Sequence, residues 1–254
     1  MTNLIDDTKT MFWRSALTTL RNPTTVIMSL VVPAILMLVF VNVFGGSMDV
    51  GGMNFANFIV PGILVNVLIQ SSISTGIGVN QDMNTGVINR FRSMDIASSA
   101  FLTGHVLVAF LKAILTTSVA LGVAYIAGFR PVASLTQWLL IAALIALFIL
   151  AVTWLAVMMG VTMASPEDVS GILTMASLMA FLSPGMAPTE NMPRFLRIFA
   201  ENQPMGPFVN SIRALTNGYS TQGNDLLLTL IWWGGILVVT FAMSVAVYRK
   251  KLTA

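Results

Sequence analysis

Lys112 is the residue whose type and position most directly suggest chemistry, because it lies inside a long apolar stretch. A charged side chain is expensive at membrane depth, so it marks a candidate contact for a ligand or a counter-charge. Lys112 stands ten residues after Leu102, where the apolar stretch begins, and so lies about 15 Å along a helix. Its ammonium group is expected to extend to the membrane interface or to pair with another group in the inner leaflet. The alternative is that it contacts a substrate.

Asn66 and Gln70 are the second candidate pair, because they lie four residues apart in another apolar stretch and therefore on one face of a helix. Amides in such positions commonly form hydrogen bonds between helices. They can equally line a path for a polar group. Asn66, Gln70 and Lys112 are therefore the predicted residues of a substrate path.

Motifs for catalysis or metal binding are missing from the sequence. It has no G-x-x-x-x-G-K-[ST] phosphate loop, no H-E-x-x-H and no G-x-S-x-G, no cysteine, and a single histidine, His105. Glu167 and Asp168 follow Ser165-Pro166, a pattern that starts a helix, and are not expected to be a catalytic pair. We therefore expect no catalytic residue, no metal site and no cofactor in this chain, which is not an enzyme.

The composition is that of an integral membrane protein. Of 254 residues, 56% are hydrophobic and only 9% are charged, whereas soluble domains carry about 25% charged residues. We attribute the net charge of +3 to basic residues that set the orientation of the chain in the bilayer. Nucleic acid is therefore not expected as a partner.

The apolar stretches predict one all-α transmembrane domain over residues 1–254. Crossing the hydrocarbon takes about 20 apolar residues. The fifth predicted span is short and runs into Ser183-Pro184-Gly185, so we expect it to break before it crosses fully. Six spans meet the criterion: Val26–Phe44, Phe58–Val79, Leu102–Ala127, Leu135–Met163, Val169–Met186 and Leu226–Val247.

Residues 1–24 are predicted to form an interfacial helix before the first span. A narrow polar stripe runs along an otherwise apolar helix from Leu4 to Arg21, and Trp13 is an amphipathic anchor. The alternative is an ordinary solvated helix. The stripe consists of Asp7, Thr10, Arg14 and Arg21, and the residues expected to hold the helix at the membrane are Phe12, Trp13, Arg14 and Arg21.

Residues 186–225 are predicted to form an outer helical hairpin, re-entrant or interfacial. Prolines punctuate the segment, and its two apolar pieces, Phe195–Phe199 and Phe208–Leu215, are too short to span. Irregular backbone at membrane depth must be buried in protein or line a cavity.

The basic residues predict that both termini are cytoplasmic, because the segments on that side hold more Lys and Arg. His105 then lies near the cytoplasmic end, where it is expected to pair with Asp95 or to face the headgroups. The predicted spans contain no acid, which argues against proton coupling, so another polypeptide must supply the energy for transport.

Gln81–Asp95 is predicted to be a short amphipathic cytoplasmic helix. Four apolar residues occupy an arc of about 120° on a helical wheel, and the opposite side is polar. Such a helix between two spans is suited to docking on another protein. The apolar residues are Val87, Ile88, Phe91 and Met94, and Arg90 and Arg92 are among the polar ones.

Several motifs resemble those of the ABC-2 type permeases, in particular the daunorubicin-resistance type of efflux permease. They are Phe58-Ile-Val-Pro61-Gly62, Gly76-Ile-Gly78, Asp82-Met-Asn-Thr-Gly86-Val-Ile-Asn-Arg90-Phe91-Arg92-Ser-Met94, Ser165-Pro166-Glu167 and Met192-Pro193-Arg-Phe-Leu-Arg-Ile-Phe199. They cover nearly the whole chain in a fixed order.

The resemblance implies a subunit of an ATP-driven exporter in the cell membrane that moves a drug-like or lipid-like amphipathic compound outward, as in multidrug resistance. It implies a homodimer and two copies of an ABC ATPase subunit, which binds ATP and Mg. The coupling helix of the family maps into residues 80–98, onto Gly86, Val87, Ile88, Arg90, Phe91, Arg92 and Met94.

Two other functions stay open from the sequence. One is export of a polysaccharide or a lipid-linked glycan, which needs a wide path with aromatic platforms, although aromatic residues are few in the predicted spans. The other is a membrane scaffold that transports nothing, in which Arg90 and Arg92 serve only the orientation of the chain.

Overall fold

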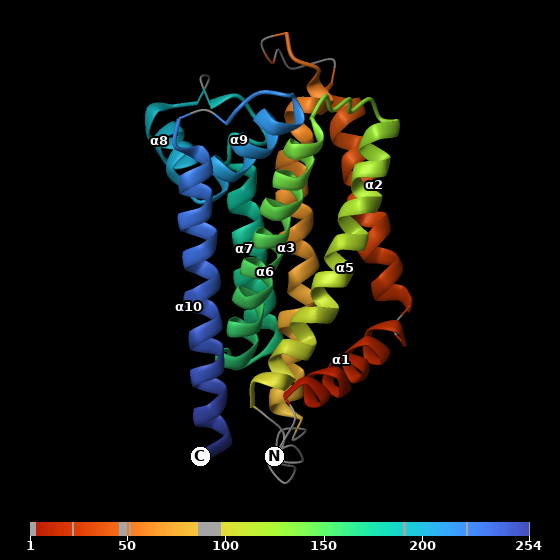
Figure 1. Cartoon of the computed structure of the whole chain (residues 1–254), viewed down its shortest axis with the longest axis vertical. Coiled ribbons are helices and arrows are strands. Elements are labelled where there is room, and N and C mark those ends of the chain that lie inside the picture. Colours follow the sequence, from red (N-terminus) through yellow and green to blue (C-terminus); the bar gives the residue numbers. More distant parts are fainter. Residues whose placement is uncertain are drawn as a thin grey trace.

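The long apolar stretches form long helices in the computed structural model, which describes residues 4–21, 23–45, 50, 52–85, 98–189, 192–221 and 223–253. Within these residues it contains helices and no strand (Figure 1). The helices are α1 Leu4–Leu20, α2 Pro23–Phe44, α3 Phe55–Asn84, α5 Ser98–Ile126, α6 Leu135–Thr162, α7 Pro166–Phe181, α8 Arg194–Asn202, α9 Met205–Thr216 and α10 Asp225–Thr253.

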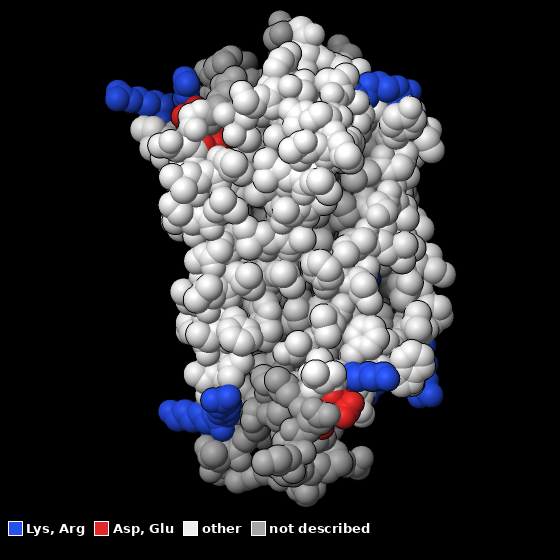
Figure 2. Space-filling model, viewed as in Figure 1, with Lys and Arg blue, Asp and Glu red and all other residues white. Residues whose placement is uncertain are grey.

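Five of the helices, α2, α3, α5, α6 and α10, are long and apolar enough to cross a membrane. On the face drawn in Figure 2, Lys, Arg, Asp and Glu gather almost entirely at the two ends, and the middle is nearly free of charge. Helices long enough to span, with an uncharged belt between their ends, fit a bilayer whose hydrocarbon core is about 30 Å thick. The chain is a multi-pass membrane protein.

The predicted fifth span, Val169–Met186, corresponds to the shorter helix α7. With 16 residues, α7 is about 24 Å long and does not reach across the hydrocarbon by itself. It starts as expected, with a capping box in which Asp168 N donates to Ser165 Oγ and Ser165 N donates to the Asp168 carboxylate. Its end at Phe181, just before Ser183-Pro184, agrees with the predicted break.

Helix α3 is the centre of the bundle. In its most apolar stretch 83% of the residues are buried, against 17% for α2 and for α10. The exposed residues of α2 and α10 are largely Leu, Ile, Val and Phe, which suit lipid tails. Helix α3 also extends five residues beyond its predicted end at Val79, so Gln81–Asn84 continue this helix and do not begin a separate one.

Backbone contacts at glycines bring α3 close to its neighbours. A Cβ atom on Gly62 would lie 2.4 Å from the carbonyl oxygen of Gly185, in the turn after α7. A Cβ on Gly160 of α6 would lie 2.5 Å from the carbonyl oxygen of Gly76. Small residues allow the backbones to approach closely. In lipid the hydrophobic effect does not hold helices together, so the van der Waals contacts made at this short distance do so instead.

Helices α8 and α9 lie at the end of the bundle opposite α1 (Figure 1). They occupy the predicted outer segment, and Arg213 of α9 anchors them. Its Nε donates to the carbonyl of Phe58 at 3.1 Å, its Nη2 donates to the carbonyl of Pro184 at 2.7 Å, and it stacks on the Phe58 ring. Burial lowers the pKa of Arg213 to about 10, so this guanidinium is charged at neutral pH.

We expect Gly62→Ala to destabilise the bundle by about 1–3 kcal/mol, because the new methyl group overlaps the Gly185 backbone. The matched control is Gly78→Ala on the same helix, where an added Cβ would meet no atom within 4 Å. Thermal unfolding in detergent, followed by tryptophan fluorescence, should show a lower midpoint for Gly62→Ala only. Equal midpoints for the two variants would contradict the close contact.

Candidate transport site

Helix α1 crosses the end of α5 and α3 at an oblique angle (Figure 1). Met11 and Ser15 are its buried residues, one turn apart. Gly104 of α5 permits the contact, because a Cβ there would lie 2.8 Å from Cβ of Met11 and 2.9 Å from its carbonyl carbon. The backbone of α1 therefore rests directly on α5.

Asp82, Arg14 and His105 form an ionic cluster, called the Asp82 cluster below, that joins α1, α3 and α5. The Arg14 guanidinium donates to both carboxylate oxygens of Asp82, at 2.9 and 3.0 Å. His105 Nε2 lies 3.1 Å from Asp82 Oδ2. All three side chains are at least partly buried. Bidentate Arg–carboxylate pairs of this kind are the stronger ion pairs in proteins.

The cluster shows the surroundings of two residues with predicted roles, His105 and Arg14. His105, for which a pair with Asp95 or a place facing the headgroups was expected, lies in contact with Asp82, while Asp95 lies outside the described residues. Arg14, on the polar stripe of the predicted interfacial helix, has its side chain turned toward the Asp82 carboxylate. Its role in holding the helix at the membrane stays a prediction. An acidic residue, Asp82, also lies within the long helix α3, beyond the predicted end of that span.

A cavity of about 410 Å³, most of whose lining residues are polar or charged, lies beside the Asp82 cluster, between α1, α3 and α5. Its size falls in the range of roughly 300–1,000 Å³ that is usual for ligand pockets. We call it the polar cavity. It is lined by Arg14, Ser15, Thr18 and Thr19 of α1, by Ser74, Thr75, Ile77, Gly78, Gln81 and Asp82 of α3, and by His105, Val108, Ala109 and Lys112 of α5.

Lys112 and Ser74 line both the polar cavity and a second cavity of about 220 Å³ against α2. Lys112 Nζ donates to Ser74 Oγ at 2.5 Å. Asn66 and Gln70 line the second cavity, so all three predicted path residues meet there. Asn66 is itself buried and donates to the carbonyl of Ser177 on α7 at 3.1 Å, which ties two helices together. Their contact with a substrate stays a prediction.

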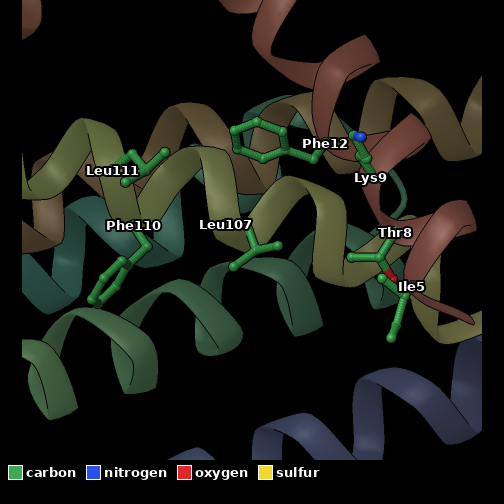
Figure 3. A pocket seen from close by; sticks show the side chains of 7 residues that line it. All are labelled: Ile5, Thr8, Lys9, Phe12, Leu107, Phe110 and Leu111. Atoms are coloured by element: carbon green, nitrogen blue, oxygen red, sulfur yellow. The ribbon is translucent and has the colours of Figure 1, made fainter.

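An apolar groove of about 470 Å³ separates another part of α1 from α5 (Figure 3). Phe12, one of the predicted membrane-holding residues, lines this groove. Trp13 is 63% exposed and Arg21 is exposed as well, whereas Arg14 faces inward. The groove is lined by Ile5, Thr8, Lys9, Phe12, Leu107, Phe110 and Leu111.

The predicted coupling residues Gly86, Val87, Ile88, Arg90, Phe91, Arg92 and Met94 lie outside the described residues. The helix end that precedes them is firmly held. Asn80 Nδ2 donates to the carbonyls of Gly160 and Met163, at 3.1 and 2.8 Å. Asn84 donates to Asn80 Oδ1. These bonds join the end of α3 to the turn between α6 and α7.

The Asp82 cluster and Ser74 were missed from the sequence, although a signal was present. Ser74, Gly78 and Asp82 recur every four residues, and His105 and Lys112 are seven apart on α5. Both spacings place polar or small residues on one helix face. Within the described part of the chain, no three His, Cys, Asp or Glu side chains gather as a metal site would require.

The sequence profile of the ABC-2 type transporter family matches residues 6–216, which includes every element of the polar cavity. The chain belongs to the ABC-2 type transporter family. As an ABC-2 permease it is a transport component, and not the ATPase of such a transporter.

This permease is similar to curated relatives along most of its length. It is 26% identical over 249 residues to the daunorubicin resistance ABC transporter permease protein DrrB1 of Streptomyces coeruleorubidus, covering 97% of this chain and 87% of the relative. It is 24% identical over 234 residues to the probable doxorubicin resistance ABC transporter permease protein DrrC of Mycobacterium tuberculosis H37Rv, covering 92% and 84%.

We expect a double-mutant cycle on Arg14→Ala and Asp82→Ala to give a coupling free energy of about 1–3 kcal/mol, because the pair is bidentate and partly buried. The measurement is unfolding of the permease in mixed micelles of rising SDS content.

The matched control cycle uses Arg197→Ala and Glu201→Ala, an exposed i,i+4 pair on α8 at 2.8 Å. Exposed helix pairs contribute about 0.3–0.5 kcal/mol. If the Arg14–Asp82 coupling is no larger than that of the control pair, the Asp82 cluster does not hold α1 in place.

Proposed function

We propose that this permease is the membrane subunit of an ATP-driven ABC exporter. It moves a hydrophobic or amphipathic compound, drug-like or lipid-like, out of the cytoplasm or the inner leaflet. The observation that carries the proposal is the ABC-2 family match over residues 6–216. The drug-resistance permeases that it resembles along 92–97% of its length support export as the direction.

ATP hydrolysis belongs to a separate subunit in this proposal. The permease sequence contains no phosphate-binding loop, so the partner ATPase binds ATP and Mg. Two copies of the permease and two copies of the ATPase form the working complex, as the family resemblance implies. The ATPase docks on Gly86–Met94, with the apolar side of the segment in a groove and Arg90 and Arg92 on acidic residues at its rim.

The held end of α3 supports this coupling route. Gly86–Met94 follows α3 after one residue, and Asn80 bonds that end of α3 to the α6–α7 turn. A displacement of the docking segment would therefore act on three helices together. The polar cavity lies on the same part of α3 and α5, so the same displacement would change its shape.

We place the permease in the plasma membrane with both termini cytoplasmic. Helix α1 and the C-terminal end of α10 lie at the same end of the bundle (Figure 1), and that end carries Arg14, Arg21 and the basic run Arg249–Lys251. The other end carries Arg130, Arg194 and Arg197, and its further arginine, Arg213, is partly buried against Phe58 and Pro184. The excess of basic residues supports the α1 end as cytoplasmic.

We expect Phe91→Ala to reduce both co-purification of the ATPase and transport, because truncating a central anchor costs a few kcal/mol of docking. The control is Phe195→Ala, the same change on α8, at the end of the bundle opposite α1, where the side chain is 72% exposed. Membrane insertion should be normal in both variants. Unchanged transport by Phe91→Ala would contradict the docking role of this segment.

A further inference from the structure

Lys112 carries a positive charge at the junction of two cavities. It lines the polar cavity between α1, α3 and α5 and also the second cavity against α2. An ammonium group has three donors, and the only hydrogen bond of its Nζ within the described residues goes to Ser74 Oγ. Two donors are therefore free for another acceptor.

The negative charge of the polar cavity is already engaged elsewhere. Asp82 accepts two hydrogen bonds from Arg14 and one contact from His105. In the described part of the chain, no carboxylate lies within ion-pair distance of Lys112. With Asp82 balanced by Arg14, Lys112 gives the cavity a net positive charge, and an uncompensated cation at membrane depth favours an anionic ligand.

The second cavity has the chemistry to hold an apolar body attached to such an anion. Beside Lys112 and the amides of Asn66 and Gln70, its walls are largely aliphatic, including Met28, Val32 and Leu36 of α2. A ligand with its charged group at Lys112 would place its apolar part along α2. Helix α2 is mostly exposed, so this side of the cavity lies next to the surrounding lipid.

We propose that the Lys112 site binds the anionic group of the transported compound, a carboxylate, phosphate or sulfate on an apolar body, and that Lys112 makes the exporter prefer anionic over neutral and cationic amphiphiles. This inference rests on the proposed export function and specifies its substrate class. Lys112 acts as a specificity residue that supplies the counter-charge, and Ser74 orients it.

The test is binding of dansyl-aminoundecanoic acid and of its neutral primary amide to the complete transporter in phosphatidylcholine vesicles, followed by dansyl fluorescence without ATP. We expect the acid to bind about tenfold more tightly than the amide, as for hydrogen bonds to a charged group. Lys112→Met should remove this preference and leave binding of the amide unchanged, which also shows that the variant is folded. Lys112→Arg should retain it.

Lys9→Met is the matched control, because Lys9 is an exposed lysine that lines the apolar groove and not the polar cavity. It should bind both probes as the unaltered protein does. An equal preference for the acid in Lys112→Met, or no preference in the unaltered transporter, would overturn the inference.

Two further arms separate the possible outcomes. Adding phosphatidylglycerol to the vesicles tests the source of the anion: if it competes with the acid without stimulating the ATPase, the site holds a bilayer lipid that is not transported, and the assignment to cargo is overturned. ATPase stimulation is measured on the same samples. Stimulation without a charge preference defeats only this inference, whereas charge-dependent binding without any stimulation or transport defeats the proposed export function.

Discussion

Backbone contact around α3 is the constraint on which the rest of this structure depends. In lipid, helices gain little from burying apolar side chains against one another, so close van der Waals packing decides which faces meet. Gly62 and Gly76 allow one side of α3 to touch the turn after α7 and the backbone of α6. Gly78, on which an added Cβ would touch nothing within 4 Å, lies instead beside the polar cavity. The face of α3 that carries Gly62 and Gly76 packs tightly, and the polar cavity therefore lies on the face that carries Gly78.

Hydropathy alone predicted the long helices, since an apolar stretch of spanning length has few other options in a bilayer. It placed the end of the second span at Val79, because Gln81 and Asp82 look too polar to continue. That judgement considers each residue separately. In the structure, Arg14 offsets the charge of Asp82, and Asn80 bonds to backbone carbonyls of another turn, so the helix continues to Asn84.

The residues of the candidate site likewise fall into those that the sequence predicts and those that only the structure reveals. Asn66, Gln70 and Lys112 could be selected by residue type alone, because polar groups in apolar stretches are uncommon. The Asp82 cluster could not, because its members come from three helices and its long-range pair, Arg14 and Asp82, is 68 residues apart in sequence. Similarly, Arg213 reads as an ordinary outer basic residue. Only the fold shows that it lies against Phe58 and Pro184.

The contacts of Arg213 make the α8–α9 end of the permease a cooperative unit. Through two hydrogen bonds, one guanidinium on α9 joins the first turn of α3 and the turn after α7. Separating either segment from Arg213 leaves a partly buried guanidinium with an unpaired donor, which costs about 1–3 kcal/mol. A gradual widening at this end is therefore disfavoured. The start of α3, the turn after α7 and helix α9 therefore form one unit at this end of the bundle.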